Sequence, residues 1–128
     1  MQLGIGSYTY TWAIGVPGQL PARPMRAEDL AAQAALLGVR VVQFADNLPL
    51  DRLSPEELAA LERQAAECGL HVEVGTRGIG GAHLARYVQL AERFHSPILR
   101  LVVDTAAHHP GQDEIIAAVQ ALVPALKR

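Results

Sequence analysis

The stretch SPEELAALERQAAECGLHVEVG, residues 54–75, decides the fold. It begins with the signals of a helix start, because Ser54 suits an N-cap, Pro55 suits the first helical position and Glu57 completes a capping box. It ends in His71–Gly75, where apolar and polar residues alternate as they do in a half-buried strand. The stretch therefore predicts a helix that is followed directly by a strand.

The same combination of strand and helix recurs along the chain, where short β-rich runs alternate with longer Ala- and Leu-rich runs. We expect strands at Leu3–Tyr8, Val39–Ala45, His71–Gly75 and Ile98–Asp104. We expect helices at about Ala27–Gly38, Ser54–Gly69, Gly81–Phe94 and Gln112–Leu126, the first two ending at glycines that suit helix C-termini.

This repeat predicts an α/β fold with four parallel strands. Parallel strands need helical crossovers, and such crossovers are right-handed. Successive expected strands begin roughly 27 to 37 residues apart, which fits one strand, one helix and their loops. A chain of 128 residues has the length of one domain, and we expect residues 1–128 to form it.

The two faces of the expected strands differ, and this favours a barrel over an open sheet. One face is apolar, whereas the other carries Gln43, Glu73 and Arg100. A sheet covered by helices on both faces would read as nearly continuous apolar runs. The pattern instead fits helices on one side and the interior of a (β/α)₈ barrel on the other, with an ion pair between Glu73 and Arg100.

Four such units make half a barrel, because a complete one needs about 250 residues. The first and fourth strands would then be open edges, and the inner face would be exposed. Two copies could close one barrel, the chain could be a fragment, or the sheet could open out flat. The last residues, Ala125–Arg128, lack a C-cap glycine, which favours a truncated or separately expressed half.

Composition excludes several classes of protein. Eleven Lys and Arg against thirteen Asp and Glu give a net charge of −2, which offers no basic surface for nucleic acid or an anionic membrane. The single cysteine, Cys68, makes no intramolecular disulfide and is expected to be inert. We find neither a signal peptide nor a run of about 18 apolar residues, so we expect a cytoplasmic protein without a membrane partner.

Chemistry in such folds gathers at the carboxyl ends of the strands. After the first expected strand, Tyr8, Tyr10 and Trp12 alternate, and an extended backbone would place all three on one side. They could stack on a sugar or plug the mouth of the barrel. After the second, Asp46 and Asn47 could bind hydroxyl groups or simply form a turn.

The last two strands add charged candidates. Arg77 lies in a glycine-rich turn, which as a phosphate signal is weak. Asp104, followed by His108 and His109, could hold a metal or handle protons, or could merely cap a loop that carries solvated histidines. The remaining histidines near the third helix, His83 and His95, are expected to be structural and away from the site.

Four runs, LGIGSYTYTWAIG, GVRVVQFADNLPL, EVGTRGI and LRLVVDT, together resemble the sugar phosphate isomerase/epimerase group of the xylose isomerase-like TIM barrels. The resemblance covers essentially the whole chain and maps to the N-terminal half of that fold. It implies metal-assisted proton transfer next to a carbonyl of a small polyhydroxy substrate. The divalent metal, Mn or Mg, is expected only in a complete barrel, because the ligands and catalytic base come from later strands that this chain lacks.

By the same resemblance, this half supplies the wall of the substrate pocket. The residues implied to bind substrate are Tyr8, Tyr10, Trp12, Asp46, Asn47, Arg77, Arg100 and Asp104. The expected partner is a second half-barrel, as a homodimer, or a missing C-terminal half. A homodimer could draw metal ligands only from Asp46, Glu73, Asp104, His108 and His109.

Two other classes of function remain open. The chain could be a non-catalytic binding or assembly module that keeps the aromatic pocket without a metal site. It could also be related to barrels that cleave DNA at abasic sites, although its acidic pI of about 6.2 and the lack of a Lys/Arg cluster count against this.

Overall fold

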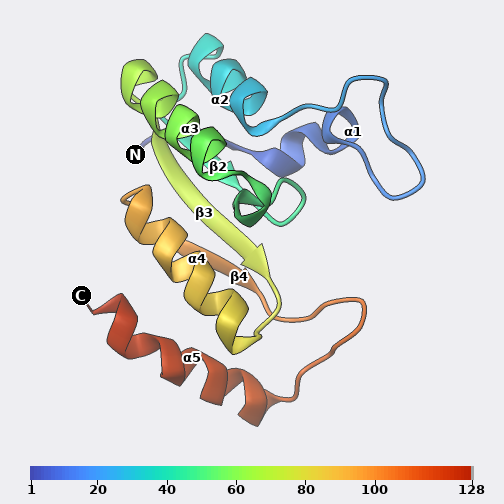
Figure 1. The fold of residues 1–128 in the computed structure, drawn as a ribbon, viewed down its shortest axis with the longest axis vertical. Coiled ribbons are helices and arrows are strands. Elements are labelled where there is room, and N and C mark those ends of the chain that lie inside the picture. The colour runs from blue at the N-terminus through green and yellow to red at the C-terminus, as the bar shows by residue number, and fades with distance from the viewer. Residues whose placement is uncertain (128) are drawn as a thin grey trace.

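A single parallel sheet organises the molecule. The computed structural model describes residues 1–127, so Arg128, the last residue of the expected domain, lies outside them. The strands are β1 (Gly4–Gly6), β2 (Val41–Phe44), β3 (His71–Arg77) and β4 (Leu99–Val102), paired in the order β1-β2-β3-β4. All three pairings are parallel, as expected from the repeat (Figure 1).

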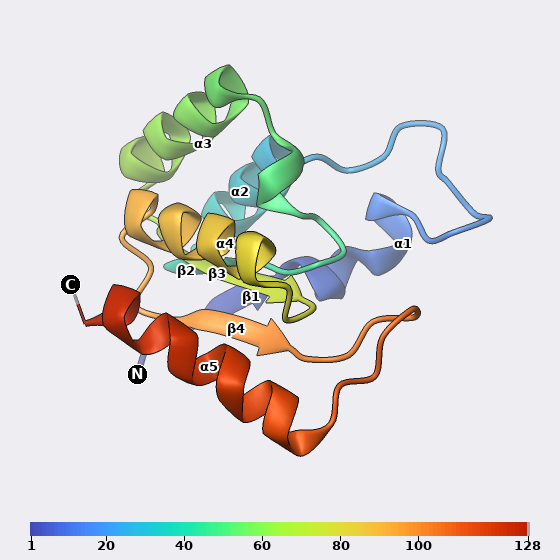
Figure 2. The same ribbon diagram turned by 60° about the horizontal axis from the view of Figure 1, so that its bottom comes forward.

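The four expected helices are all present, together with three short helical turns. The long helices are α2 (Ala27–Leu36), α3 (Pro55–Cys68), α4 (Gly81–Arg93) and α5 (Gln112–Leu126). The short elements are the 3₁₀ turns η1 (Ser7–Tyr10) and η2 (Leu50–Arg52) and the single turn α1 (Thr11–Ile14). Figure 2 shows α3, α4 and α5 succeeding one another along one side of the sheet. None of the helices in residues 1–127 combines the length and apolar character that crossing a membrane requires.

The core lies between the helices and the face of the sheet that was expected to be apolar. Val42, Phe44, Val72 and Val74 are all buried there, against Ala- and Leu-rich sides of α2, α3 and α4. The opposite face stays open, and its polar residues are half-buried or exposed. This asymmetry is that of a half-barrel, whose interior has nothing opposite it.

The expected ion pair between Glu73 and Arg100 is wrong. In the register of the sheet, Arg100 lies opposite Gly75, and Glu73 lies opposite Gln43. The Gln43 Nε2 atom donates a hydrogen bond to Glu73 Oε2 at 2.9 Å. The alternation of apolar and polar residues correctly predicts which face of the sheet each side chain lies on. The position of a side chain along the strand direction relative to its neighbours depends on the register between the strands, which the alternation does not give.

Local signals at the ends of α3 act as expected. The Glu57 amide donates to Ser54 Oγ at 3.1 Å, and the Ser54 amide donates to Glu57 Oε2 at 2.8 Å. At the other end, Gly69 takes a left-handed conformation with φ of 63°, which residues with a side chain rarely adopt. These caps fix where α3 stops and therefore where β3 begins.

The last helix, α5, is held loosely. None of its side chains in residues 112–126 is buried, and Ile116, Val119 and Leu126 are exposed. Its other side faces α4 across an apolar hollow of about 470 Å³. α5 thus presents an apolar stripe that no other element of residues 1–127 covers.

We predict that Ser54→Ala lowers the free energy of unfolding by about 1 kcal/mol, because the Glu57 amide at the start of α3 loses its hydrogen-bond acceptor. Chemical denaturation followed by circular dichroism measures the change. The control is Ser54→Asp, which keeps an acceptor and should retain most of the stability. Equal losses in both variants would contradict a capping role.

Candidate functional site

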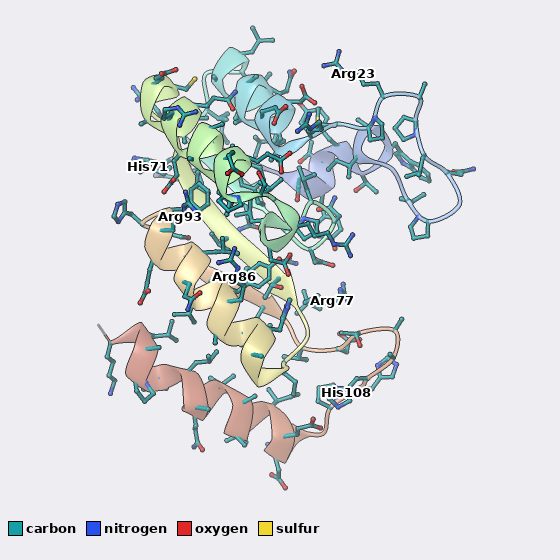
Figure 3. All side chains as sticks on the ribbon, viewed as in Figure 1. Arg23, His71, Arg77, Arg86, Arg93 and His108 are labelled. Atoms are coloured by element: carbon teal, nitrogen blue, oxygen red, sulfur yellow. The ribbon has the colours of Figure 1, made fainter. Side chains whose placement is uncertain are left out.

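Four of the expected site residues meet at the carboxyl edge of the sheet, although they come from different strands. Tyr8 follows β1 in η1, Asp46 follows β2, Arg77 ends β3, and Asp104 follows β4. Figure 3 shows Arg77 at the tip of β3 and His108 further out, in the loop between β4 and α5. Parallel topology explains this meeting, because all four strands end at the same edge.

Asp46 is the centre of a hydrogen-bonded network. Its Oδ2 atom accepts from Arg77 Nε at 2.8 Å, and its Oδ1 atom accepts from the Tyr8 hydroxyl at 2.8 Å. On its other side, Arg77 Nη1 donates to the Asp104 carbonyl oxygen at 3.1 Å and lies 3.7 Å from Asp104 Oδ1. One carboxylate thus orients a phenol and a guanidinium, and the guanidinium reaches the next strand end.

The hydrogen bonds of this network favour the charged forms of Asp46 and Arg77. Burial alone would raise the pKa of the Asp46 carboxyl, but hydrogen bonds from Arg77 and Tyr8 outweigh that effect, so the pKa lies below its ordinary value. The pKa of Arg77 is raised, chiefly by its hydrogen bond to Asp46 and then by Tyr8. Asp46 and Arg77 are therefore an ionised pair at neutral pH.

Asn47 is fixed by a residue that sequence analysis missed. The Ser7 hydroxyl donates to Asn47 Oδ1 at 2.5 Å and accepts from the Ala45 amide at 3.0 Å. The buried Asn47 Nδ2 atom has no hydrogen-bond partner within residues 1–127. Nothing in the sequence marks Ser7, because its partners lie some forty positions away.

The aromatic loop differs from expectation. Tyr8, Tyr10 and Trp12 do not share one side of an extended chain, because η1 and α1 wind this segment into helical turns, in which alternate residues diverge. Tyr10 packs against the core, whereas Tyr8 is 45% exposed and Trp12 is 71% exposed. Tyr8 and Trp12 remain available to a ligand, and Tyr10 is mainly structural.

The histidines after β4 do not converge on one point. His108 Nε2 lies 3.0 Å from Glu114 Oε1, and His109 Nδ1 lies 3.6 Å from Asp104 Oδ2. Within residues 1–127, no three His, Cys, Asp or Glu side chains are grouped so that they could hold a metal ion. The donors present in this half therefore do not fit the divalent metal that the resemblance implies for a complete barrel.

His83 lies at the site, contrary to expectation. It occupies the first turn of α4, and a helix that follows a parallel strand begins at the carboxyl edge. Its Nε2 atom is 2.7 Å from the hydroxyl of buried Thr76, and its Nδ1 atom is 4.0 Å from Asp51 Oδ2. The Tyr87 ring lies tilted against the His83 ring, with their centres 4.8 Å apart, and the Tyr87 hydroxyl donates to Asp51 Oδ1 at 2.9 Å. His95, by contrast, follows the far end of α4.

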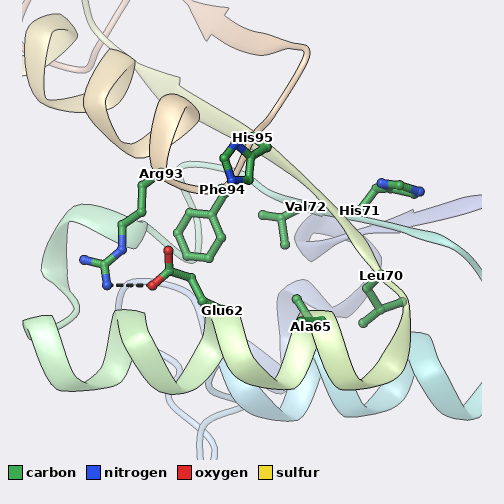
Figure 4. Close-up of a pocket in the computed structure, with 9 residues that line it drawn as sticks. Glu62, Ala65, Leu70, His71, Val72, Arg93, Phe94 and His95 are labelled. Carbon is green, nitrogen blue, oxygen red and sulfur yellow. Dashed lines mark hydrogen bonds and ion pairs between the residues drawn. The ribbon is translucent and has the colours of Figure 1, made fainter.

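A small pocket joins these two groups of residues. It measures about 220 Å³ and is lined by the Asp46 and Arg77 side chains on one side and by His83 and Tyr87 on the other. A larger hollow of about 360 Å³ lies at the opposite edge, between α3 and α4 beside His71 (Figure 4). That hollow is far along β3 from Arg77, so we place the candidate site at the smaller pocket.

Comparisons with known proteins agree with this architecture. No family model matches the chain. It is 32% identical over 124 residues to 3-oxo-isoapionate decarboxylase from Pectobacterium atrosepticum, covering 97% of this chain and 44% of that protein. Its fold matches a D-psicose 3-epimerase from Clostridium cellulolyticum H10 with a TM-score of 0.74 at 13% identity, and another D-psicose 3-epimerase with a TM-score of 0.70.

The chain spans about half the length of each protein it matches, whereas 97–99% of the chain itself is covered. The expected α/β fold, four parallel units that correspond to half of an epimerase-type TIM barrel, is confirmed. The resemblance is thus confirmed at the level of the fold, over about half of the length of the D-psicose 3-epimerase chains.

We predict that Asp46 and Arg77 are energetically coupled at pH 7, so that the loss of stability on replacing both is smaller than the sum of the two single losses, because the two side chains are directly hydrogen-bonded. A double-mutant cycle with Asp46→Asn and Arg77→Gln measures this coupling by denaturation. The folded-state pKa of Asp46 is lowered, so the coupling persists above the ordinary value of 3.8 and disappears as the pH falls below it. Asp46→Asn with Arg93→Gln serves as the control cycle and should be additive.

Tyr87 gives a prediction at alkaline pH. Burial chiefly raises its pKa to about 12 from an ordinary 10.0, and the Asp51 hydrogen bond adds to this while Thr76 opposes it. A raised folded-state pKa contributes stability that is fully present below about pH 10 and is lost as the pH rises toward 12. Denaturation across this range should show a loss that is smaller in Tyr87→Phe. A loss of the same size in the variant would contradict the prediction.

Proposed function

We propose that this chain is the substrate-binding half of a (β/α)₈ enzyme that acts next to the carbonyl of a small polyhydroxy compound. The observation that supports it best is the network that joins Tyr8, Asp46, Arg77 and Asp104 at the carboxyl edge of the sheet. Enzymes with this architecture bind their substrates at that edge. The sequence relative is named a decarboxylase and the structural relatives are named epimerases, which favours chemistry at a carbon beside a carbonyl.

In this proposal the residues of the chain bind and orient the substrate. The carboxylates of Asp46 and Asp104 accept hydrogen bonds from hydroxyl groups, and Asn47, which the Ser7 hydroxyl holds in place, lies next to Asp46. Exposed Trp12 and Tyr8 pack on the carbon skeleton, with Tyr10 behind them. Arg77 and Arg100 direct hydrogen bonds toward carbonyl or anionic oxygens.

The unit that completes the barrel supplies the rest of the reaction. A metal would polarise the carbonyl and a base would move the proton, and both would come from that unit, because the donors in this half do not fit a metal. The catalytic residues of this chain are therefore not assigned.

We propose a second copy of the chain as the completing unit. A two-fold axis along the barrel would pair the β4 edge of each copy with the β1 edge of the other, giving eight parallel strands. Apolar residues are exposed near both open edges of the sheet. Ile116 and Val119 lie on α5, which follows β4, whereas Leu3 precedes β1 and Leu36 ends α2. The alternative is the C-terminal half of a longer relative, which would cover the same surfaces.

The alternative is a non-catalytic protein, which would need no metal site, and residues 1–127 contain no group of side chains that could hold a metal ion. A binding or assembly module would keep the network at Asp46 and the exposed Trp12 but would turn nothing over. Binding and catalysis therefore have to be measured separately.

Light scattering after size exclusion tests the completing unit. We expect about twice 13.7 kDa for the chain and a monomer for Val119→Glu, because a charge on the apolar stripe of α5 opposes its burial. Ala117→Glu, which adds the same charge to an exposed position outside the stripe on the same helix, is the matched control and should remain a dimer. A monomeric wild-type chain would overturn the homodimer and leave the C-terminal half as the partner to seek.

Trp12 is the only tryptophan and is exposed in the turn after Tyr8 and Tyr10, so its fluorescence is expected to respond to a ligand that packs against this segment. We expect D-psicose to change it in the assembled protein, and nuclear magnetic resonance of the same mixture with added Mn²⁺ or Mg²⁺ to detect a product. Binding without a product would favour the non-catalytic module. The proposed function is overturned if D-psicose, erythritol and D-erythronate all fail to bind and none of them gives a product.

A further inference from the structure

Arg100 occupies a place that distinguishes it from the other cations of the site. It lies on the inner face of β4, opposite Gly75 of β3. Its guanidinium carbon is 5.9 Å from the centre of the Tyr8 ring, whose hydroxyl donates to Asp46. Arg100 is thus connected to the network at the carboxyl edge but lies one layer further toward the interior of the barrel.

Arg100 lacks a carboxylate partner, whereas Arg77 has two. Arg77 pairs with Asp46 and approaches Asp104, but Arg100 forms no ion pair with any carboxylate of residues 1–127. Glu73, the acidic residue of the same sheet face, already accepts from Gln43. The charge of Arg77 is therefore compensated within the chain, and that of Arg100 is not.

Closing the barrel turns this exposed cation into an enclosed one. Removing a guanidinium from water without an anion beside it is strongly unfavourable, so an enclosed arginine needs a negatively charged partner. The inner face also carries a hollow of about 220 Å³, which is lined by Gly4 and Gly6 of β1 and by Glu73 of β3. The tyrosine ring above Arg100 offers only a weak cation–π contact.

We propose that Arg100 anchors an anionic group of the ligand, a carboxylate or a phosphate, inside the completed barrel. This inference rests on the proposed function and narrows its substrate class to sugar acids or sugar phosphates. Arg100 and Arg77 belong to neighbouring layers of the inner face, about 7 Å apart along the strands. A short ligand can therefore place its anion at Arg100 while its hydroxyl groups reach the network at Asp46.

Arg100 has one competing partner, the Glu73 side chain of a second copy across the barrel. That pair would also compensate the charge, but it would contribute to assembly and not to the choice of ligand. The two cases predict different results for Arg100→Gln, since only a ligand anchor changes the preference for an anion.

The test compares two probes of equal carbon number in the assembled protein, the acid D-erythronate and the neutral polyol erythritol. Trp12 fluorescence measures both affinities. We expect D-erythronate to bind about tenfold more tightly, and this ratio to fall to about one in Arg100→Gln, because charge-assisted hydrogen bonds to the anion are lost. Arg100→Lys should retain part of the preference.

Arg86→Gln is the matched control, since it removes an exposed arginine on the outer helix α4 and should leave the ratio unchanged. Thermal melting shows whether each variant is folded. Inorganic phosphate and acetate, added as competitors, distinguish the two anions: stronger displacement by phosphate assigns a sugar phosphate, and stronger displacement by acetate assigns a sugar acid.

Three results would overturn the inference. Equal affinities for the two probes, unchanged in Arg100→Gln, would do so while leaving the proposed function intact. A loss of assembly that is shared and non-additive between Arg100→Gln and Glu73→Gln, with the affinity ratio unchanged, would assign Arg100 to the second copy. If none of the ligands binds, the proposed function fails together with the inference.

Discussion

The whole molecule depends on a sheet that is covered on one face only. Helices bury the apolar side of the strands, where Val42, Phe44, Val72 and Val74 form the core, and the other face keeps Gln43, Glu73 and Arg100 beside solvent. A parallel sheet is ordinarily buried on both faces, so this arrangement is stable chiefly through its helical side. The polar face, the two open edges and the apolar stripe on α5 all follow from having four strands where a barrel has eight.

Asp46 links the ends of neighbouring strands and so organises the candidate site. It follows β2, between the strand ends that carry Tyr8 and Arg77, and its two oxygens hold one of these side chains each. The resulting network is organised before any ligand arrives, which lowers the conformational entropy lost on binding. The charge of Arg77 is compensated there, whereas that of Arg100, one layer back along the strands, is not, so the two cations of the inner face differ in their need for an anionic partner.

Most of the fold could be predicted from the sequence because its signals are local. Ser54 and Glu57 cap each other within four residues, and the alternation around Val72 and Val74 marks the buried face. The pairing of Glu73 was predicted incorrectly, because register depends on contacts between strands. Ser7 could not be found, since its role arises only when β1 and β2 meet, but His83 could have been placed at the site from the topology alone.

The absence of buried side chains in residues 112–126 has a consequence for the dynamics of the molecule. A helix in a protein is kept folded mainly by its packing against other elements. Because α5 buries no side chain, its backbone amides are among those least protected from hydrogen exchange. Its backbone amides should exchange with solvent sooner than those of α3 at low protein concentration. Any unit that covers the stripe at Ile116 and Val119 would slow that exchange, so the order of α5 is coupled to the assembly state of the protein.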